Sequence, residues 1–176
     1  MRSIVVCLTA AIVASTTPAL GETLTAAMFL ATPTGAGAPV GSITIRQGPA
    51  GAAFTLDLHG LPPGQHGFHV HTNPSCAPGE KDGKPVPAGA AGAHLDPEMS
   101  GVHMGPMGMG HLGDLPLITV AADGAVEAVV TAPRIKSLDA LRGHALMIHA
   151  GGDNYADSPA PLGGGGARLA CGVIAG

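Results

Sequence analysis

The sequence predicts an all-β domain, an eight-stranded Greek-key β-barrel or sandwich with two long metal-site loops, and three observations support this fold class. Twenty-eight glycines and 16 prolines indicate many turns rather than a helix bundle. With three phenylalanines, one tyrosine and no tryptophan, the core must be built from aliphatic side chains and methionine. Hydrophobic residues make up 45% of the 176-residue chain and charged residues 11%, a balance that excludes disorder and suffices for one domain.

Strand-like segments follow one another along the chain, separated by Pro- and Gly-rich pieces. The expected strands are 23–30, 40–45, 52–58, 67–71, 117–120, 126–130, 145–149 and 167–174. A short helical turn is expected from Ser137 to Leu141, with Ser137 as its cap. Residues 72–116 and 151–166 show no periodicity and form the two long loops. An unstructured loop as long as the first is unusual, so metal ions and a disulfide are expected to order it.

The first 21 residues have the pattern of a secretory signal peptide. Arg2 supplies the positive start, residues 4–13 the apolar stretch, and residues 18–21 the small residues suited to cleavage. The apolar run is about half the roughly 20 residues that a membrane span needs, so a transmembrane anchor is the weaker alternative. We therefore expect one mature domain over residues 22–176, located in the periplasm and without membrane contact.

Charge and cysteine usage limit the partners and the redox compartment. The formal net charge is −4, and without a basic patch nucleic acid is excluded as a partner. Signal cleavage would remove Cys7 and leave Cys76 and Cys171, which in an oxidising compartment are most simply one disulfide. Closing a loop of about 95 residues would stabilise the fold by about 4 to 5 kcal/mol. Two free thiols, or thiolates on a metal, are the alternatives.

Six histidines and one aspartate form a dense series of candidate metal ligands. They are His69, His71, His94, His103, His111, Asp114 and, later in the chain, His149. One zinc or copper ion usually takes three or four ligands, so seven candidates indicate two ions or two ions that share a ligand. His69 and His71 lie two residues apart on an expected strand and therefore face the same side. Such a pair alone would more simply be two surface histidines.

The loop residues suggest a second, closed site. His103, His111 and Asp114 with one further nitrogen could form a four-ligand tetrahedral zinc site, although Asp114 alone would be read as a turn residue. His94 lies between the two groups in sequence. It could bridge two ions through both ring nitrogens, and the ring would then be deprotonated.

Five segments in order resemble the copper/zinc superoxide dismutases of the bacterial exported type. They are Gly-Phe-His-Val-His (67–71), Asn-Pro-Ser-Cys (73–76), Gly-His-Leu-Gly-Asp-Leu-Pro (110–116), Met-Ile-His-Ala-Gly-Gly-Asp-Asn-Tyr (147–155) and Pro-Leu-Gly-Gly-Gly-Gly-Ala-Arg-Leu-Ala-Cys-Gly-Val-Ile (161–174). The resemblance covers nearly all of the mature chain. It implies an enzyme with one copper and one zinc per subunit that converts superoxide to oxygen and hydrogen peroxide.

The resemblance also implies roles for individual residues. Copper would be held by His69, His71, His94 and His149, and zinc by His94, His103, His111 and Asp114. Cys76 and Cys171 would form the family disulfide, and Asp153 would accept hydrogen bonds from one copper ligand and one zinc ligand, His69 and His103. Arg168 would lie beside copper as a cationic fork for the superoxide anion. His94 would be catalytic too, because it is expected to leave copper and take a proton on reduction.

Several residues have no firm role at this level. Lys81 and Lys84 could steer the anion or be ordinary solvated lysines. His59, His66 and His144 are expected to be core or surface residues, His66 with some chance of contacting a ligand. Met99, Met104, Met107 and Met109 could serve copper loading, because thioethers favour Cu(I), but we expect them to fill gaps in the loop.

Two other functions compete with the enzyme. A copper chaperone or buffer on the same fold would bind the metals without turnover, but the full ligand set together with Arg168 argues against it. A purely structural zinc protein would leave His69, His71 and His149 without a purpose. The sequence is compatible with a homodimer and with a monomer.

Overall fold

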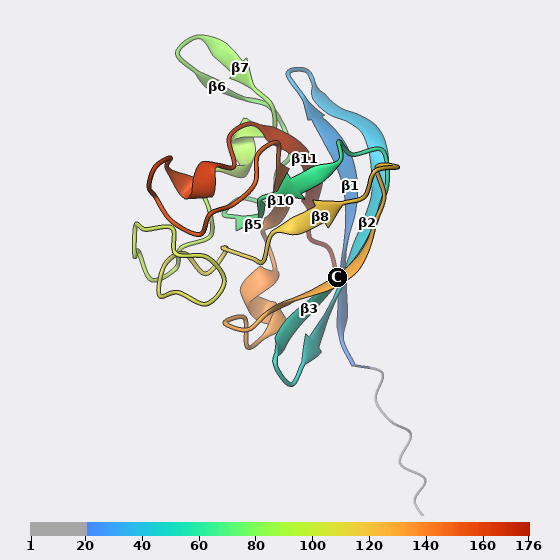
Figure 1. The fold of residues 1–176 in the computed structure, drawn as a ribbon, viewed down its shortest axis with the longest axis vertical. Coiled ribbons are helices and arrows are strands. Elements are labelled where there is room, and N and C mark those ends of the chain that lie inside the picture. The colour runs from blue at the N-terminus through green and yellow to red at the C-terminus, as the bar shows by residue number, and fades with distance from the viewer. Residues whose placement is uncertain (1–20) are drawn as a thin grey trace, which may run out of the picture.

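The computed structural model describes residues 21–176, so the expected signal peptide lies, except for Gly21, outside the described residues. Seven strands form one antiparallel sheet in the order β5-β10-β11-β1-β2-β3-β9 (Figure 1). Their bounds are β1 Thr23–Thr32, β2 Gly35–Gly48, β3 Gly51–Leu58, β5 Phe68–His71, β9 Val126–Ala132, β10 Ala145–His149 and β11 Arg168–Val173. The all-β prediction is confirmed.

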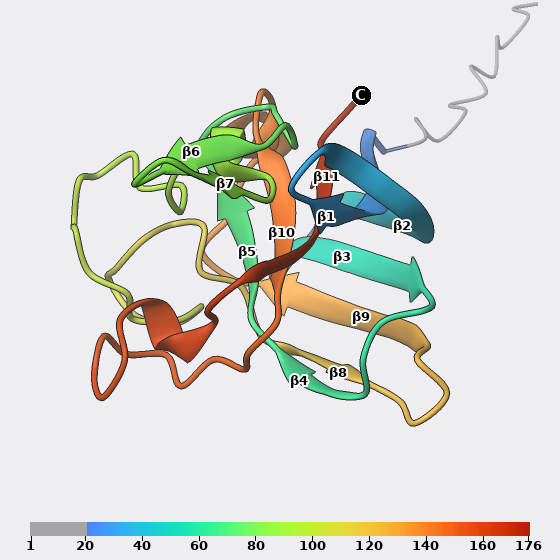
Figure 2. The ribbon, with the colours of Figure 1, turned by 90° about the horizontal axis from the view of Figure 1, so that it is seen from above.

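The sheet curls, and a small ladder lies across its open side. Strands β4 (Gly64–His66) and β8 (Ile118–Val120) pair with each other; β4 leads directly into β5, and β8 contacts β9 (Figure 2). The chain crosses between the two edges of the large sheet from β3 to β5 and again from β9 to β10. Such crossings are the connections of a Greek-key arrangement. Residues 21–176 form eleven strands, so the expected count of eight is not confirmed.

The core is aliphatic, as the composition requires. On β3 the side chains of Phe54, Leu56 and Leu58 are buried while Thr55 and Asp57 are exposed, the alternation of a strand with one face in the core. The two buried phenylalanines, Phe54 and Phe68, meet edge to face with ring centroids 5.7 Å apart. Phe68 thus anchors β5, the strand of the His-x-His pair, in the core.

The strand bounds differ from the prediction at glycine and proline residues that indicate a turn but lie in a strand. Residues 35–39 were expected in a turn but begin β2, and β1 and β2 are joined by Pro33 and Thr34 alone. Gly41 permits this because it has a φ of +119° and lies against the backbone of Asp57 and Leu58, where a Cβ would collide. Strand β10 has the predicted bounds, and Ser137 caps η2 (Leu138–Leu141) by accepting from Asp139 N, as expected.

The two long loops contain short elements that periodicity did not indicate. The first holds the hairpin of β6 (Gly79–Lys81) and β7 (Lys84–Val86), followed by the 3-10 turn η1 (Gly89–Ala91). The second holds the 3-10 turn η3 (Leu162–Gly164). Among the described residues, no helix is both long enough and apolar enough to cross a membrane.

Candidate metal centre

The sheet itself positions three of the candidate ligands. His69 and His71 lie on β5 and His149 ends β10, its neighbour, with Met147 opposite His69 and Ala145 opposite His71. Successive side chains of a strand alternate between faces, so Phe68 and Val70 enter the core while the two histidines share the other face. This confirms the facing predicted for the pair.

The long loop delivers the other ligands by lying alongside β5. Val70 N donates to Gly113 O at 2.9 Å, and Leu95 N donates to Val70 O at 2.8 Å. Isolated β-bridges join His71 to His94 and His69 to Asp114. The loop residues are therefore held by backbone bonds to the strand that carries the first two histidines.

Four histidines form one compact group. His69, His71, His94 and His149 are all buried, and each offers a ring nitrogen within 4.8 Å of those of the others. His71 Nδ1 donates to Gly92 O at 2.9 Å and His149 Nδ1 to Gly166 O at 3.2 Å, which leaves their Nε2 atoms 3.3 Å apart. Burial lowers the pKa of His71 to about 2 and that of His149 to about 3. Both rings are therefore neutral and keep a lone pair at neutral pH.

A second group converges on one carboxylate oxygen. Asp114 Oδ1 lies 3.0 Å from His94 Nδ1, 3.0 Å from His103 Nδ1 and 3.3 Å from His111 Nδ1. Four ligand atoms each about 2.0 to 2.1 Å from one zinc ion in tetrahedral geometry stand about 3.3 Å from one another. The three distances from Asp114 Oδ1 match this spacing. The group in which all ligand-type atoms lie within 4.8 Å of one another has His69 in place of His111 beside His94, His103 and Asp114.

Three buried nitrogens of this cluster have no hydrogen-bond partner. Among residues 21–176 the buried side-chain polar atoms without a hydrogen bond are His69 Nδ1, His94 Nε2 and His103 Nδ1. His103 Nδ1 lies 3.0 Å from Asp114 Oδ1 but is not oriented to hydrogen-bond to it. Buried polar atoms are almost always paired, because leaving one unpaired costs about 1 to 3 kcal/mol. All three belong to histidines of the two groups whose ligand-type atoms lie within 4.8 Å of one another, so bound metal is the partner that their chemistry fits.

Asp153 connects the two groups from behind. Its Oδ2 accepts from His69 Nε2 and its Oδ1 from His103 Nε2, both at 2.8 Å, as the resemblance implied. Gly163, with a φ of +69°, packs on this pair; a Cβ there would collide with the Asp153 carboxylate and lie 2.9 Å from His103 Nε2. Burial alone would lower the pKa of His103, but Asp114 and Asp153 raise it to about 9.

The comparisons with known proteins agree with this geometry. A family model described as copper/zinc superoxide dismutase matches residues 40–174. The chain belongs to the copper/zinc superoxide dismutase family. The superoxide dismutase [Cu-Zn] of Brucella abortus is 56% identical over 157 residues, which cover 89% of this chain and 91% of that protein. Superoxide dismutase [Cu-Zn] 1 of Salmonella typhimurium is 60% identical over 154 residues, 87% of each chain.

Solved structures show the same family. The Cu/Zn superoxide dismutase from Brucella abortus superposes with a TM-score of 0.86 at 56% identity, covering 88% of this chain and all of that one. The solution structure of the monomeric copper, zinc superoxide dismutase from Salmonella enterica gives a TM-score of 0.79 at 54% identity, with 88% and 100% covered.

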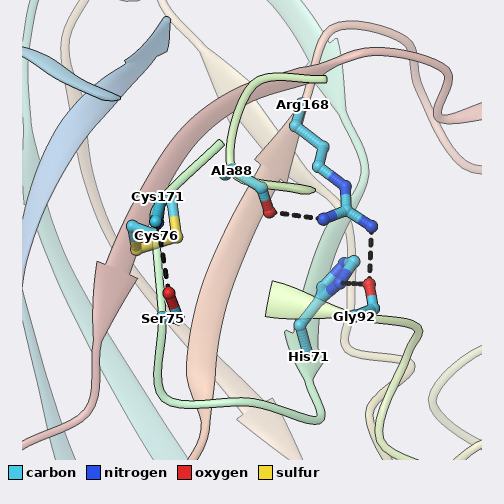
Figure 3. The surroundings of a disulfide bond; sticks show 8 residues. His71, Ser75, Cys76, Ala88, Gly92, Arg168 and Cys171 are labelled. Carbon is cyan, nitrogen blue, oxygen red and sulfur yellow. Dashed lines mark hydrogen bonds between the residues drawn. A yellow bond between two sulfur atoms is a disulfide. The ribbon is translucent and has the colours of Figure 1, made fainter. Parts of the chain in front are cut away.

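Within this dismutase fold Arg168 lies at the edge of the four-histidine group. It starts β11 opposite His149, and its guanidinium donates to Ala88 O and Gly92 O, the second of which also accepts from His71 (Figure 3). Burial lowers its pKa, yet an arginine remains charged at any physiological pH. A fixed cation therefore stands beside His71.

The disulfide between Cys76 and Cys171 is confirmed. The two Cα atoms lie 5.7 Å apart across 95 residues of sequence. The bond ties the long loop to β11, three residues after Arg168 (Figure 3). It thereby fixes the loop that carries Gly92 and Ala88 to the strand that carries the arginine.

Two further residues support the centre and were not assigned from the sequence. His66 is buried, with Nδ1 2.8 Å from His149 O and Nε2 2.8 Å from Pro62 O, so it holds the backbone of a candidate ligand. Arg134 Nη1 donates to Gly110 O at 2.8 Å and to His111 O at 3.0 Å. For His66 the only signal was its place beside the ligand strand; for Arg134 the sequence held none.

The remaining candidates lie outside the cluster. His59 is exposed, and His144 is partly exposed, with Nδ1 2.6 Å from Thr72 O. Lys81 and Lys84 are exposed and face each other across the β6–β7 hairpin. Met99, Met104, Met107 and Met109 are 88%, 48%, 77% and 73% exposed, so the expectation that they fill gaps inside the loop is wrong.

Proposed function

We propose that superoxide is disproportionated at a copper ion held by His69, His71, His94 and His149, beside a zinc ion held by His94, His103, His111 and Asp114. Superoxide dismutation with copper and zinc follows from the family; the assignment of each residue is the proposal. One observation carries it: the two nitrogens of His94 have different surroundings. Nδ1 lies 3.0 Å from Asp114 Oδ1, while Nε2 is buried without a partner, in the ring that also belongs to the four-histidine group.

His69 must be assigned with care, because it lies close to both groups. Its ligand-forming atoms also fall within 4.8 Å of those of His94, His103 and Asp114. We assign it to copper because Asp114 Oδ1 and three nitrogens from other histidines already make up the four ligands of a tetrahedral zinc site. His69 Nε2 donates to Asp153, which leaves Nδ1 as the ligand atom and fixes the ring.

Each residue contributes a defined part of the chemistry. When bound, copper supplies the Cu(II)/Cu(I) couple that oxidises one superoxide to oxygen and reduces the next to hydrogen peroxide, and zinc is redox-silent. His94 Nε2 is the atom proposed to take a proton in one half of the cycle and to give it up in the other. Arg168 binds and orients the anion with its planar fork.

The low pKa values of the buried histidines suit this role. Burial lowers the pKa of His94 to about 4, although hydrogen bonding to Asp114 acts in the opposite direction. Neutral imidazoles bind metal without first losing a proton, so His71 and His149 are ready for copper well below neutral pH. A non-catalytic copper buffer is not favoured, because it would have no use for Arg168 beside His71.

We also propose that residues 1–21 are a signal peptide and that the mature domain, residues 22–176, is periplasmic. The disulfide supports export, because such bonds persist in oxidising compartments. The relatives named above are bacterial. A homodimer remains compatible with the sequence; sedimentation of the purified mature chain, compared with the relative described as monomeric, tests it.

A pair of variants tests the division of ligands. His71→Ala should lower copper affinity and activity by at least about 100-fold, since even residues behind the ligands contribute 10- to 100-fold, and should leave zinc in place. Asp114→Ala should do the reverse, releasing zinc and loosening the loop more than it affects copper. Metal content by mass spectrometry, circular dichroism and superoxide decay are measured on both.

His59→Ala is the matched control, because this histidine is exposed and lies outside the cluster. It should keep both metals and full activity. Retained copper and activity in His71→Ala would remove that residue from the copper site. Equal loss of both metals in Asp114→Ala would refute separate ligand sets.

A further inference from the structure

The methionines of the described chain fall into two classes. Met28 and Met147 are fully buried in the core. The other four lie within residues 99–109 on the long loop that carries His103 and His111, and they are exposed (the yellow-green loop in Figure 1). Methionine is apolar and fills gaps, so four exposed thioethers on one short segment are unexpected for packing.

Three of these side chains start close together. The spacing Met104, Met107, Met109 places Gly108 between the last two. The position of a Cβ on Gly108 would collide with Met104 Cβ, and that of Gly110 lies 3.0 Å from the same atom. Met107 and Met109 are the two chain neighbours of Gly108, so all three methionines start from the short stretch of backbone where Gly108 packs against Met104.

The loop is held at its base rather than free. His111 N donates to Val102 O at 3.1 Å, which closes the segment between them. Met104 N donates to Asp114 Oδ2 at 3.1 Å, and His103 N donates to Asp157 Oδ2 at 2.8 Å. The three thioethers are therefore presented to solvent from a fixed base, while their own flexible side chains can adjust around a ligand.

The chemistry of the group selects one kind of ion. Thioether sulfur is a soft, neutral ligand that favours Cu(I), whereas Cu(II) favours nitrogen and oxygen ligands. Asp114 and His111, the nearby nitrogen and oxygen donors, are already used within the buried cluster. The exposed methionines of this loop should therefore bind a soft monovalent ion such as Cu(I) in preference to Cu(II).

We propose that Met104, Met107 and Met109 form a surface site for one Cu(I) ion, separate from the buried metal centre. The site does not depend on the ligand assignments proposed above, because none of its three donors belongs to them. It gives the chain a capacity for one more copper ion than the buried centre holds.

The test uses the holoprotein, reduced with ascorbate under anaerobic conditions and titrated with Cu(I) against a chromophoric Cu(I) chelator. The wild type should take up one Cu(I) beyond the metals of the centre. Met104→Leu/Met107→Leu/Met109→Leu keeps the volume and apolar character and should lower this affinity at least tenfold. Met107→Leu alone, at a 77% exposed position with little packing to lose, should also weaken it.

Met99→Leu is the control, since Met99 is exposed on the same loop but outside the triad; it should leave Cu(I) uptake unchanged. In spectra of the reduced protein with labelled methionine methyl groups, three signals should shift together on adding Cu(I), while those of Met28 and Met147 stay. Equal uptake by the wild type and the triple variant would overturn the proposal. The proposal would also be overturned if the triple variant took up as much Cu(I) as the wild type but had a different sedimentation coefficient. That result would make the loop a contact between protein chains.

Discussion

The two ring nitrogens of His94 lie in different parts of the candidate centre. Nδ1 belongs to the group around Asp114, and Nε2 is buried and unpaired. A neutral imidazole has one N–H and one lone pair, so binding metal at both nitrogens requires the ring to lose its proton. In the proposed centre His94 would help to hold both metals, and its Nε2 would be the atom that holds the proton, so one ring would serve metal binding and proton transfer.

Arg168→Ala should lower the rate of superoxide decay by about tenfold or more and weaken its dependence on ionic strength, because the cation beside His71 attracts and orients the anion. Arg168→Lys should recover part of the attraction but not the fork. Pulse radiolysis at several salt concentrations measures both effects. Arg46→Ala, at an exposed arginine remote in sequence, serves as control; a rate and salt response for Arg168→Ala equal to this control would remove Arg168 from the site.

At the scale of elements, regular strands could be predicted from the sequence and the loops could not. Residues 145–149 are strand-like in composition with no competing turn signal, and β10 has those bounds. Residues 35–39 contain two glycines and a proline, so local composition hid their pairing with β1. The β6–β7 hairpin is exposed and polar, and therefore shows no hydrophobic period. Long-range bonds such as those of Arg134 leave no local pattern.

In the candidate site, too, local patterns could be predicted from the sequence and long-range contacts could not. The zinc-type spacing of His103, His111 and Asp114 was visible in the sequence, because those ligands lie within one loop. The disulfide between Cys76 and Cys171 could be inferred from compartment and count. By contrast, the position of His149 beside His71 depends on the pairing of β5 with β10, and only the family resemblance indicated it.

Removing the disulfide should loosen the loop against β11. Cys76→Ser/Cys171→Ser should lower the free energy of unfolding by about 3 to 5 kcal/mol, because the unfolded chain regains the freedom of a 95-residue loop. The loop residues Ala88 and Gly92 would also be less firmly held near Arg168. Denaturant unfolding of the metal-loaded variant measures the change, and a midpoint equal to that of the wild type would contradict it.

For the whole molecule, metal binding and folding share the same charged and buried groups. The curled sheet supplies His69, His71 and His149 on its strands, while the proposed loop ligands depend on backbone bonds to β5 and on two carboxylates. Burial alone would raise the pKa of Asp114, but the neighbouring His103 and His94 rings hold that pKa well below its usual range. In the metal-free protein, histidines with lowered pKa values therefore lie next to one with a raised pKa.

The metal-free protein should lose stability as the pH falls from about 6.5 to about 4. His71, His94 and His149 have pKa values of about 2, 4 and 3 in the folded state, below the ordinary 6.5, so the unfolded chain binds more protons in this window. Each group can lower the free energy of unfolding by up to about 2 kcal/mol at pH 5. The pKa of His103 is raised to about 9, so this residue acts in the opposite direction. Its contribution to the free energy of unfolding is complete below pH 6.5 and is lost as the pH rises through 9.

Thermal unfolding of the metal-free protein between pH 7 and pH 4.5 measures this dependence. The Tm should fall steadily, and the metal-loaded protein should resist the fall to a lower pH, because bound metal occupies the same nitrogens. A Tm that stays level or rises on acidification would show that the three rings are not held neutral by burial.

The most direct measurement of the central claim is anomalous diffraction, at the copper and zinc absorption edges, from crystals of the fully loaded protein. Two separate peaks should flank one imidazole, with copper at Nε2 of His94 among His69, His71 and His149, and zinc at Nδ1 among His103, His111 and Asp114. A single peak, or two peaks that do not lie on opposite sides of that ring, would contradict the account.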